Sequence, residues 1–526
     1  MITVDIELAI DYNTEAIKDE LCRLFPMSRD EIGELCLLRR NLVLKNGAAP
    51  YYKCKLAFSA SEEREAGLLK IRNRVKPYEI GTLRPIPYRG VCSPVIVGAG
   101  PAGLFSALLF AESGADPIII ERGLPVEQRE KKVALFNTLG ILDPECNVQF
   151  GEGGAGTFSD GKLKVGGHDI YKDKVLCELI SAGADPSVFY ADNAHLGTDK
   201  LPTLMRRLRQ RIISLGGRFI FGAKLCDLDI SDGQLRAVKY IKEGREEYLP
   251  TDTAILAIGH SARDTIRMLK DKGLTMEARG FGIGMRVEHP REYINDLIYK
   301  ESRELISDTA SYHLVTHLPS GRSVYSFCMC PGGTVVGACS EEGGVVTNGM
   351  SRYDRMADNS NAAILVSVTP NDFPSDDPLS GIELQRSIER AAYSLTGGYK
   401  APVCSLSDLL GDGITATTPG VKPSYERGVE LVHPGGYLPR FITESLASGF
   451  SDFDKWIEGF ALGNAALTGP ETRTTSPVRI LRAEGGEALG LRGVYPIGEG
   501  AGYSGGIISS AVDGLRIAHR ILTKNQ

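Results

Sequence analysis

The sequence lacks the cysteine spacings that disulfide frameworks and zinc sites require. Its eleven cysteines are scattered singly, none forms a CxxC pair, and their odd number does not complete a disulfide framework. Cysteines used in this way are typical of proteins in a reducing compartment. We therefore predict that the protein holds no metal and works in the cytoplasm.

A secretion signal and a membrane span are also missing. The opening residues MITVDIELAIDYNTEAIKDE have no basic start and no long apolar core, so we expect no signal peptide. The stretch nearest to a span, VIVGAGPAGLFSALLFA, carries Gly and Pro early and is soon followed by charges. It predicts a buried strand, turn and helix, and hence no membrane partner.

The chain has no strong excess of charge of one sign. Its formal net charge of −6 does not favour nucleic-acid binding by the whole chain. Residues 35–89 differ, with twelve Lys and Arg against four Glu. This segment is either a solvated linker and sheet edge or a surface for an anionic partner. Nucleic acid is not expected as a partner, but it stays open for the N-terminal region.

The composition that is present is that of a soluble globular protein with several domains: 526 residues, 42% hydrophobic and 24% charged. Glycine is abundant, with 60 residues that gather in short clusters. Because glycine loses the most backbone entropy on ordering, such clusters predict places where bare backbone is needed.

Hydrophobic periodicity predicts the elements. Residues 2–8 alternate like a strand, Asn13 is a candidate helix N-cap, and strand-like runs follow at 35–44 and 51–60. Together they predict a β-α-β-β unit, followed by a proline-containing linker. Further along we expect a helix around 201–216, single strands over 218–230 and 252–260, and helices near 350–365 and 380–395.

A GxGxxG motif lies in VIVGAGPAG, where Gly98, Gly100 and Gly103 follow an apolar strand and open an apolar helix. The first glycine permits a tight turn, the second lets backbone approach a pyrophosphate, and the third lets helix pack on strand. Glu121 ends the next strand, where a carboxylate can accept from a ribose hydroxyl. The motif predicts a bound dinucleotide; the alternative is a glycine-rich turn in an unliganded α/β fold.

A second turn of this kind lies near the end of the chain, where Gly498-Glu499-Gly500 is followed by Gly505-Gly506 and a helix. An NAD domain has no use for a distant returning strand, whereas the parts of extended FAD lie along different segments. Arg122 could suggest a 2′-phosphate, but Glu121 already occupies the ribose position. We therefore predict FAD.

At these motifs the chain resembles FAD-dependent oxidoreductases of the glutathione-reductase-like superfamily. More narrowly, it resembles a bacterial family of NAD(P)/FAD-dependent dehydrogenases, through NVQFGEGGAGTFSDGKL, AIGHSARDT, VYSFCMCPGG, ETRTTSPVRI and GEGAGYSGG. The resemblance implies an α/β fold: a Rossmann-like FAD-binding domain with an inserted mixed α+β substrate domain, behind a small N-terminal ferredoxin-like domain. The expected ranges are 1–80 for the N-terminal domain, 93–165, 195–265 and 485–526 for the FAD-binding domain, and 166–194 and 266–484 for the substrate or cap domain.

The resemblance also implies which residues contact FAD. They are Gly98, Gly100, Pro101, Ala102 and Gly103 at the pyrophosphate, Glu121 with Arg122 at the ribose, Lys224 or Leu225 at the adenine, Gly259 at the end of a buried strand, Gly498 and Glu499 at the ribityl phosphate, and Gly505, Gly506 and Ile507 by the flavin ring. Many flavoproteins of this kind have Gly-Asp where this chain has Gly498-Glu499. The longer side chain is expected to shift that contact to water or to backbone.

The densest glycine cluster is NVQFGEGGAGTFSDGKLK, residues 147–164. In the wider superfamily this region passes beside the pyrophosphate and the flavin, which would explain the bare backbone at Gly153 and Gly154. Phe158, Ser159 and Lys162 are then the side chains retained for contact. The alternative is a plain hinge between domains.

The leading hypothesis for function is an FAD-dependent dehydrogenase or reductase that moves hydride between a small-molecule substrate and flavin N5. An FAD-dependent monooxygenase, or a flavin-bearing protein that binds RNA or another partner through its basic N-terminal region, are the alternatives. The string GFGIGMRVEH runs into Pro290 instead of an apolar helix, so it predicts a strand and no second nucleotide domain. If NAD(P)H is the reductant, it docks transiently at the substrate face.

No residue is assigned as catalytic. Candidates for proton handling are His260, Glu288 and His289, and candidates for clamping an acidic substrate are Arg263, Arg286, Arg473 and Arg479. A structural role is the alternative for each. Cys328 and Cys330 share one face of a regular strand, which allows a dithiol, although buried packing is the simpler interpretation.

Overall fold

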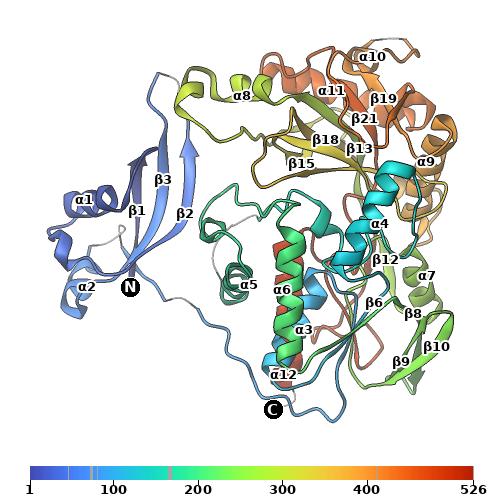
Figure 1. Cartoon of the computed structure of the whole chain (residues 1–526), viewed down its shortest axis with the longest axis horizontal. Coiled ribbons are helices and arrows are strands. Elements are labelled where there is room, and N and C mark those ends of the chain that lie inside the picture. The colour runs from blue at the N-terminus through green and yellow to red at the C-terminus, as the bar shows by residue number, and fades with distance from the viewer. Residues whose placement is uncertain (46, 72–74, 80, 164–168, 412, 525–526) are drawn as a thin grey trace. The chain divides into compact units, whose positions relative to one another are not determined.

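The computed structural model describes residues 1–45, 47–71, 75–79, 81–163, 169–411 and 413–524 (Figure 1). Contacts divide the chain into two compact units: Met1–Arg84, Lys162–Leu196 and Tyr299–Asp308 form unit 1, and Pro85–Gly161, Gly197–Ile298 and Thr309–Gln526 form unit 2. The sequence interpretation had assigned residues 166–194 to a cap domain, whereas the contacts group them with the N-terminal residues. The division into three domains stays a prediction.

Unit 1 contains an antiparallel sheet in the order β2-β3-β1-β4, made by β1 (Ile2–Ala9), β2 (Leu35–Val43), β3 (Tyr51–Phe58) and β4 (Lys76–Pro77). Helices α1 (Thr14–Leu24), α2 (Glu62–Leu68) and α5 (Ile170–Ser181) belong to the same unit. The predicted order of strand, helix, strand, strand is confirmed. The Asn13 side chain accepts from the Ala16 N–H and caps α1, as expected.

The basic stretch of unit 1 is interleaved with carboxylates. Across the sheet, Lys53 lies opposite Glu7 and Lys55 lies opposite Asp5. Arg40 is enclosed, with its guanidinium over the rings of Tyr52 and Tyr190. This register places a carboxylate opposite each of the two lysines, and an anionic partner for this region stays a prediction.

Unit 2 contains a parallel sheet in the order β23-β11-β5-β6-β7. Its strands are β5 (Val95–Val97), β6 (Ile118–Glu121), β7 (Arg218–Phe221), β11 (Ala254–Leu256) and β23 (Val494–Pro496). Continuous apolar runs such as VIV and IIIE are buried, as in parallel sheets covered on both faces. The last strand therefore returns to pair with β11, as the C-terminal glycine turn had suggested.

Helices α3 (Pro101–Glu112), α6 (Leu201–Ser214) and α12 (Ile507–Lys524) pack beside one another against this sheet (Figure 1). The predicted helix at 201–216 is thus confirmed. The single strand predicted over 218–230 is wrong, because the chain turns at Gly222, whose φ is +65°. After that glycine, β8 (Ala223–Ser231) joins β9 (Gln234–Lys242) and β10 (Arg245–Pro250) in a separate antiparallel sheet.

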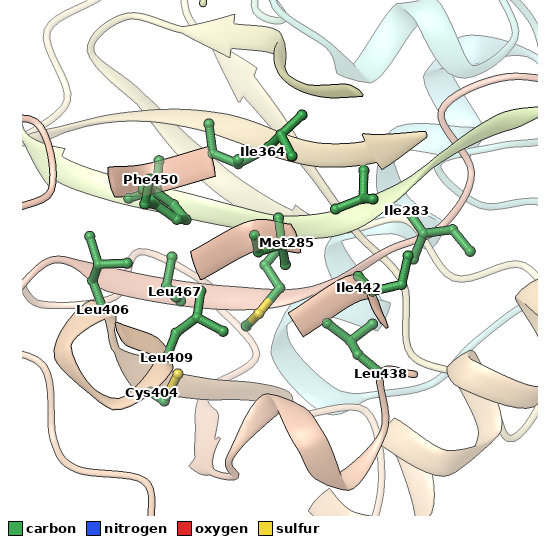
Figure 2. Close-up of a cluster of buried hydrophobic side chains, with 14 of the residues drawn as sticks. Ile283, Met285, Ile364, Cys404, Leu406, Leu409, Leu438, Ile442, Phe450 and Leu467 are labelled. Carbon is green, nitrogen blue, oxygen red and sulfur yellow. The ribbon is translucent and has the colours of Figure 1, made fainter. Parts of the chain in front are cut away.

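A large sheet in unit 2 has the order β14-β15-β18-β13-β21-β19-β20. Its strands are β13 (Phe281–Pro290), β14 (Val315–His317), β15 (Ser323–Cys330), β18 (Asn359–Val368), β19 (Ala401–Ser405), β20 (Val429–Leu431) and β21 (Ala466–Glu471). Residues of β13, β18 and β21 pack with α11 (Arg440–Trp456) in one apolar core, to which Ile283, Ile364, Ile442 and Phe450 belong (Figure 2).

Two of the expectations for this region can be compared directly. The strand predicted at GFGIGMRVEH is β13, and the helix near 380–395 is α9 (Ser380–Thr396). The helix predicted near 350–365 is wrong, because β17 (Thr347–Ser351) ends there and β18 begins at Asn359. The run AAILVSV is buried along nearly its whole length. A strand buried on both faces shows no alternation of polar and apolar residues, so its sequence does not reveal that it is a strand.

The remaining helices and strands include α4 (Val126–Leu139), α7 (Arg263–Asp271), α8 (Arg291–Tyr299), α10 (Leu406–Leu410), β12 (Met276–Ala278), β16 (Gly333–Gly337) and β22 (Val478–Ile480). Within the part of the chain that the structure describes, no helix is both long and apolar enough to cross a membrane.

Candidate functional site

The GxGxxG turn joins β5 to α3. A Cβ at Gly98, whose φ is +104°, would overlap the Ala257 carbonyl, and a Cβ at Gly103 would overlap the Gly98 carbonyl. The chain's own packing thus requires both glycines. Gly100 differs, because its φ is −77° and its Cβ would lie 3.8 Å from the nearest atom, the Cα of Gly154.

Helix α3 begins at Pro101 directly after this turn. Its N-cap, Gly100, supplies no side-chain hydrogen bond, so the helix N-terminus keeps its N–H groups and positive dipole end for another acceptor. The strand, turn and helix predicted around the motif are confirmed, and binding of a pyrophosphate there stays a prediction.

The second glycine run lies against the first. The Gly153 N–H donates to the Ala99 carbonyl over 2.8 Å, and a Cβ at Gly154 would lie 3.1 Å from the Gly100 Cα. Two segments some fifty residues apart are therefore in backbone contact, with no side chain between them.

The C-terminal turn joins the same cluster. A Cβ at Gly498 would lie 2.9 Å from the Ala102 Cβ, and one at Gly500 would lie 2.5 Å from the Gly259 carbonyl oxygen. The structure thus brings together the predicted residues that follow β5, β11 and β23.

Helix α12 begins beside this cluster at Ile507, after Gly505 and Gly506, the latter with a φ of +95°. A Cβ at Gly156 would lie 3.0 Å from Cγ1 of Ile507, so the start of α12 also touches the second glycine run. Four glycine-containing segments that are distant in sequence thus meet in one region of unit 2, and the last of them leads into α12.

Glu121 connects these segments. Its Oε2 accepts from the Ala99 N–H over 2.8 Å, and its Oε1 accepts from the N–H groups of Gly123 and Gly151 over 2.8 and 2.9 Å. A carboxylate has about four acceptor positions, which leaves Oε2 able to accept once more. The predicted contact with a ribose hydroxyl is compatible with this arrangement and stays a prediction.

Sequence reasoning missed Arg129, which organises the second glycine run. Its fully buried guanidinium donates to five carbonyl oxygens, those of Asn147, Val148, Gly151, Glu152 and Gly154. Burial lowers the pKa of Arg129 to about 10, so the side chain stays charged at neutral pH. Nε and Nη2 each donate to one carbonyl, and the two N–H groups of Nη1 are shared among the other three.

A signal for Arg129 exists in the sequence. Residues 126, 129, 133 and 136 are spaced along one helical face, and the other three are Val, Val and Phe. A lone arginine on an apolar face indicates a buried partner for its charge.

Glu152, within the run itself, is also buried. It accepts from the Val126 N–H over 2.8 Å and pairs with Arg209 over 2.9 Å. Burial raises the pKa of Glu152, and these two donors oppose that rise. Since a hinge needs few fixed contacts, this bonding favours a rigid cradle over a hinge.

The predicted contact side chains already have partners within the protein. Arg122 is paired with Asp264 and Glu145 over 2.7–3.0 Å. The Phe158 ring lies beneath the guanidinium of Arg129, 4.8 Å from ring centroid to Cζ. Ser159 Oγ donates to a neighbouring carbonyl in its own turn.

Two further predicted residues belong to other elements of the structure. Lys162 belongs to unit 1, where its backbone forms a bridge with His195. Leu225 is buried on β8 opposite Tyr240. The adenine contact of Leu225 and the flavin contact of Lys162 stay predictions.

Glu499 carries a perturbed carboxyl group. It is partly buried, and burial raises its pKa to about 8, opposed in part by the charge of Arg279. Among the described residues, none donates a hydrogen bond to this carboxyl. At pH 7 it therefore holds its proton.

The candidate clamps are paired internally. Arg263 and Arg473 both bind Glu389, over 2.8 and 2.7 Å, and all three side chains are buried. Burial favours the neutral form of Glu389, but the two arginines outweigh it and hold its pKa below the usual value. Arg286 is likewise paired with Glu471 over 2.6 Å. These contacts leave the three arginines as structural charges instead of a substrate clamp.

The three proton-handling candidates differ in burial and in their distance from the glycine cluster. Glu288 and His289 are fully buried; Glu288 accepts from Asn359, and His289 shares a hydrogen bond with the Phe460 carbonyl. His260 follows Gly259 directly, and burial with the nearby arginines lowers its pKa to about 3. Of the three, His260 alone adjoins the glycine cluster, as a neutral ring.

Comparison with known proteins identifies the family to which the chain belongs. Residues 280–474 match the sequence family described as "FAD-dependent protein, C-terminal domain-like". A protein of Clostridium beijerinckii, called "Uncharacterized protein", is 40% identical over 532 residues, which cover 99% of this chain and 98% of that protein. The chain belongs to the family of this clostridial protein. The match of residues 280–474 supports FAD as its cofactor.

Two solved structures show a distant likeness to this chain. A geranylgeranyl bacteriochlorophyll reductase-like protein of Thermoplasma acidophilum is 11% identical with a TM-score of 0.36, covering 82% of each chain. The L-proline dehydrogenase of P. horikoshii is 12% identical with a TM-score of 0.34, covering 84% of this chain and 94% of its own. Both TM-scores are too low to support further inference. For metals, no group of three or more His, Cys, Asp or Glu is placed as ligands in the described ranges.

Proposed function

We propose that this protein is an FAD-dependent oxidoreductase of the glutathione-reductase-like type, which moves hydride between a small-molecule substrate and the flavin. The observation that supports it is the meeting of the glycine segments after β5, β6, β11 and β23 with the start of α12. Such bare backbone at the carboxyl ends of parallel strands is where dinucleotides bind in folds of this class.

The residues fit the cofactor at several points. Gly100 has room for a Cβ within the protein, so its lack of a side chain is explained by something outside the chain. The uncapped N-terminus of α3 suits the pyrophosphate, and the last acceptor position of Glu121 Oε2 suits a ribose hydroxyl. Gly498 and Glu499 are assigned to the ribityl phosphate, and Gly505 to Ile507 to the flavin ring.

When bound, FAD supplies two-electron chemistry by taking up or giving hydride at N5. The protein's part is positioning and charge. Arg129 fixes the second glycine run, and the N–H groups at the start of α12 stabilise negative charge on a neighbouring group. Glu499, protonated at neutral pH, adds no negative charge beside a phosphate. NAD(P)H is proposed as a transient reductant.

The test compares two glycine-to-alanine variants of the full chain. Gly100→Ala should raise the dissociation constant for FAD by about tenfold or more, because the new methyl group meets the cofactor and nothing else. Gly67→Ala, in α2 with open space around it, is the matched control and should bind FAD like the wild type. FAD is measured by absorbance and after release by denaturation. Colourless wild-type protein that takes up no added FAD would refute the proposal.

The direction of electron flow is tested separately. Anaerobic titration with NADH and with NADPH should bleach the flavin if either is the reductant. Substrate-dependent oxygen uptake would instead support the monooxygenase alternative.

A further inference from the structure

Strand β15 ends irregularly at the sequence Phe327-Cys328-Met329-Cys330. Its pairing with β18 shifts register between Phe327 and Cys330, and Cys328 has a φ of +41°. A positive φ is uncommon for a residue with a side chain, and such residues gather at functional sites. The expectation that both thiols lie on one face of a regular strand is therefore wrong.

The irregularity brings the two cysteines together. Residues i and i+2 of a regular strand lie about 6.6 Å apart, near the upper end of the range for a disulfide. Here the register shift lets the Cys330 thiol donate to the Cys328 carbonyl over 3.2 Å. A hydrogen bond with the Cys328 side chain, and then burial, hold the pKa of Cys330 well above its usual value.

A buried cation lies beside the pair. Nη1 of Arg286 donates to the Cys328 carbonyl over 3.1 Å and lies 3.9 Å from Sγ of Cys330. Glu471 fixes this guanidinium through two further hydrogen bonds. This positive charge stabilises the thiolate that Cys330 becomes when it gives up its proton to resolve a mixed disulfide.

The two thiols differ in access. Cys330 is fully buried, whereas Cys328 is partly exposed. The adjoining Phe327 side chain is 37% exposed and gives the accessible thiol an apolar neighbour. An accessible sulfur next to a buried, protonated one is the arrangement of an attacking and a resolving cysteine.

We propose that Cys328 and Cys330 form a redox-active dithiol that reduces a disulfide-containing substrate. The Cys328 thiolate attacks one sulfur of the substrate disulfide, forming a mixed disulfide and releasing the first substrate thiol. Cys330, as its proton leaves, attacks Sγ of Cys328 and releases the second thiol. The protein pair is oxidised by two electrons, the substrate disulfide is reduced by two, and the two protons of the dithiol end on the released thiols. The step needs no FAD, so it stands apart from the proposed function above.

The experiment uses the full chain with oxidised glutathione as the probe. The protein is reduced with dithiothreitol, desalted without oxygen and mixed with the probe, and remaining thiols are then alkylated. Tandem mass spectrometry should locate a Cys328–Cys330 disulfide, and fragmentation distinguishes it from Cys339 in the same tryptic peptide. Two glutathione molecules should be released per chain oxidised. If both thiols of the wild type remain alkylatable in excess probe, the proposal is overturned, with no variant needed.

Variants then assign the roles. Cys330→Ser should trap one glutathione on Cys328, and Cys328→Ser should leave Cys330 unmodified. Cys226→Ser, which removes a single partly buried cysteine on β8, is the matched control and should react like the wild type. Undiminished glutathione release by Cys328→Ser would place the reaction on other cysteines and overturn the proposal.

Discussion

The two glycine runs look alike in sequence, yet they need glycine for different reasons. In the first run, Gly98 and Gly103 are fixed by backbone carbonyls that a Cβ would overlap. In the second, a Cβ at Gly151 or Gly153 would overlap side chains, those of Arg129 and Thr157. Backbone next to the parallel sheet shapes the first run. Side chains hold the second run in place: Arg129 of α4 and Thr157 of the run's own turn. Glycine content alone therefore does not tell a cofactor contact from a packing contact.

Removing the Arg129 guanidinium, which holds the second glycine run, should have the largest effect on stability. Arg129→Met removes the guanidinium donor from five carbonyls, and those of Asn147 and Val148 keep no other donor among the described residues. We expect it to lower the free energy of unfolding by about 3–5 kcal/mol. Urea denaturation measures this change. Arg440→Met, on the exposed face of α11, is the control and should stay within about 0.5 kcal/mol of the wild type. If Arg129→Met and Arg440→Met were equally stable, the hydrogen bonds of Arg129 would not contribute to stability.

The backbone contact of the first run comes next. Gly103→Ala should destabilise the protein by about 2–3 kcal/mol, because its methyl group overlaps the Gly98 carbonyl. The comparison is with Gly100→Ala in protein freed of FAD, which should unfold like the wild type. Equal destabilisation of both variants would remove the distinction between a packing glycine and a cofactor glycine.

The connection between the runs should matter less. Glu121→Gln places an amide N–H against one of the N–H groups of Ala99, Gly123 or Gly151, at a cost of about 1–2 kcal/mol. FAD content, measured on the folded variant, should fall with it. Normal stability together with lost FAD would assign Glu121 to the cofactor alone.

The effect expected from Glu499 differs from the others because it depends on pH. Its folded pKa of about 8 lies above the usual carboxyl value, so the folded state binds the proton more tightly than the unfolded state. Its contribution to stability is complete at pH values below the usual carboxyl pKa, and it declines as pH rises to about 8. Glu499→Gln should therefore gain stability relative to the wild type, by a few kcal/mol in total, as the pH rises from 5 to about 8. Parallel stability curves for the two proteins would show that the carboxyl is not perturbed.

The sequence predicted what local patterns determine. The strand, turn and helix around Gly98 follow from the motif, and the returning strand at 494–496 follows from the C-terminal glycines. The helix expected at 350–365 failed because β18 is buried on both faces and shows no period of two.

Long-range pairing lay beyond sequence reasoning. Glu389 is 126 residues from Arg263 and 84 from Arg473, so nothing local showed that these charges neutralise one another. Arg129 was recognisable as a buried arginine, but the five carbonyls that it binds depend on the path of a loop. The irregularity at Cys328 arises from the register of β15 against β18, which no motif records.

The pairing of β23 with β11 has a consequence for biosynthesis. Synthesis runs from the N-terminus, so β5, β6, β7 and β11 are made well before β23 (Val494–Pro496) and α12 (Ile507–Lys524). Until then α3, whose residues Ala102–Ala111 are buried in the finished fold, lacks the neighbour that covers it near Gly514. The nucleotide fold is thus completed only once residues 494–524 have been made, and a chain that lacks them leaves an apolar helix exposed to chaperones and proteases.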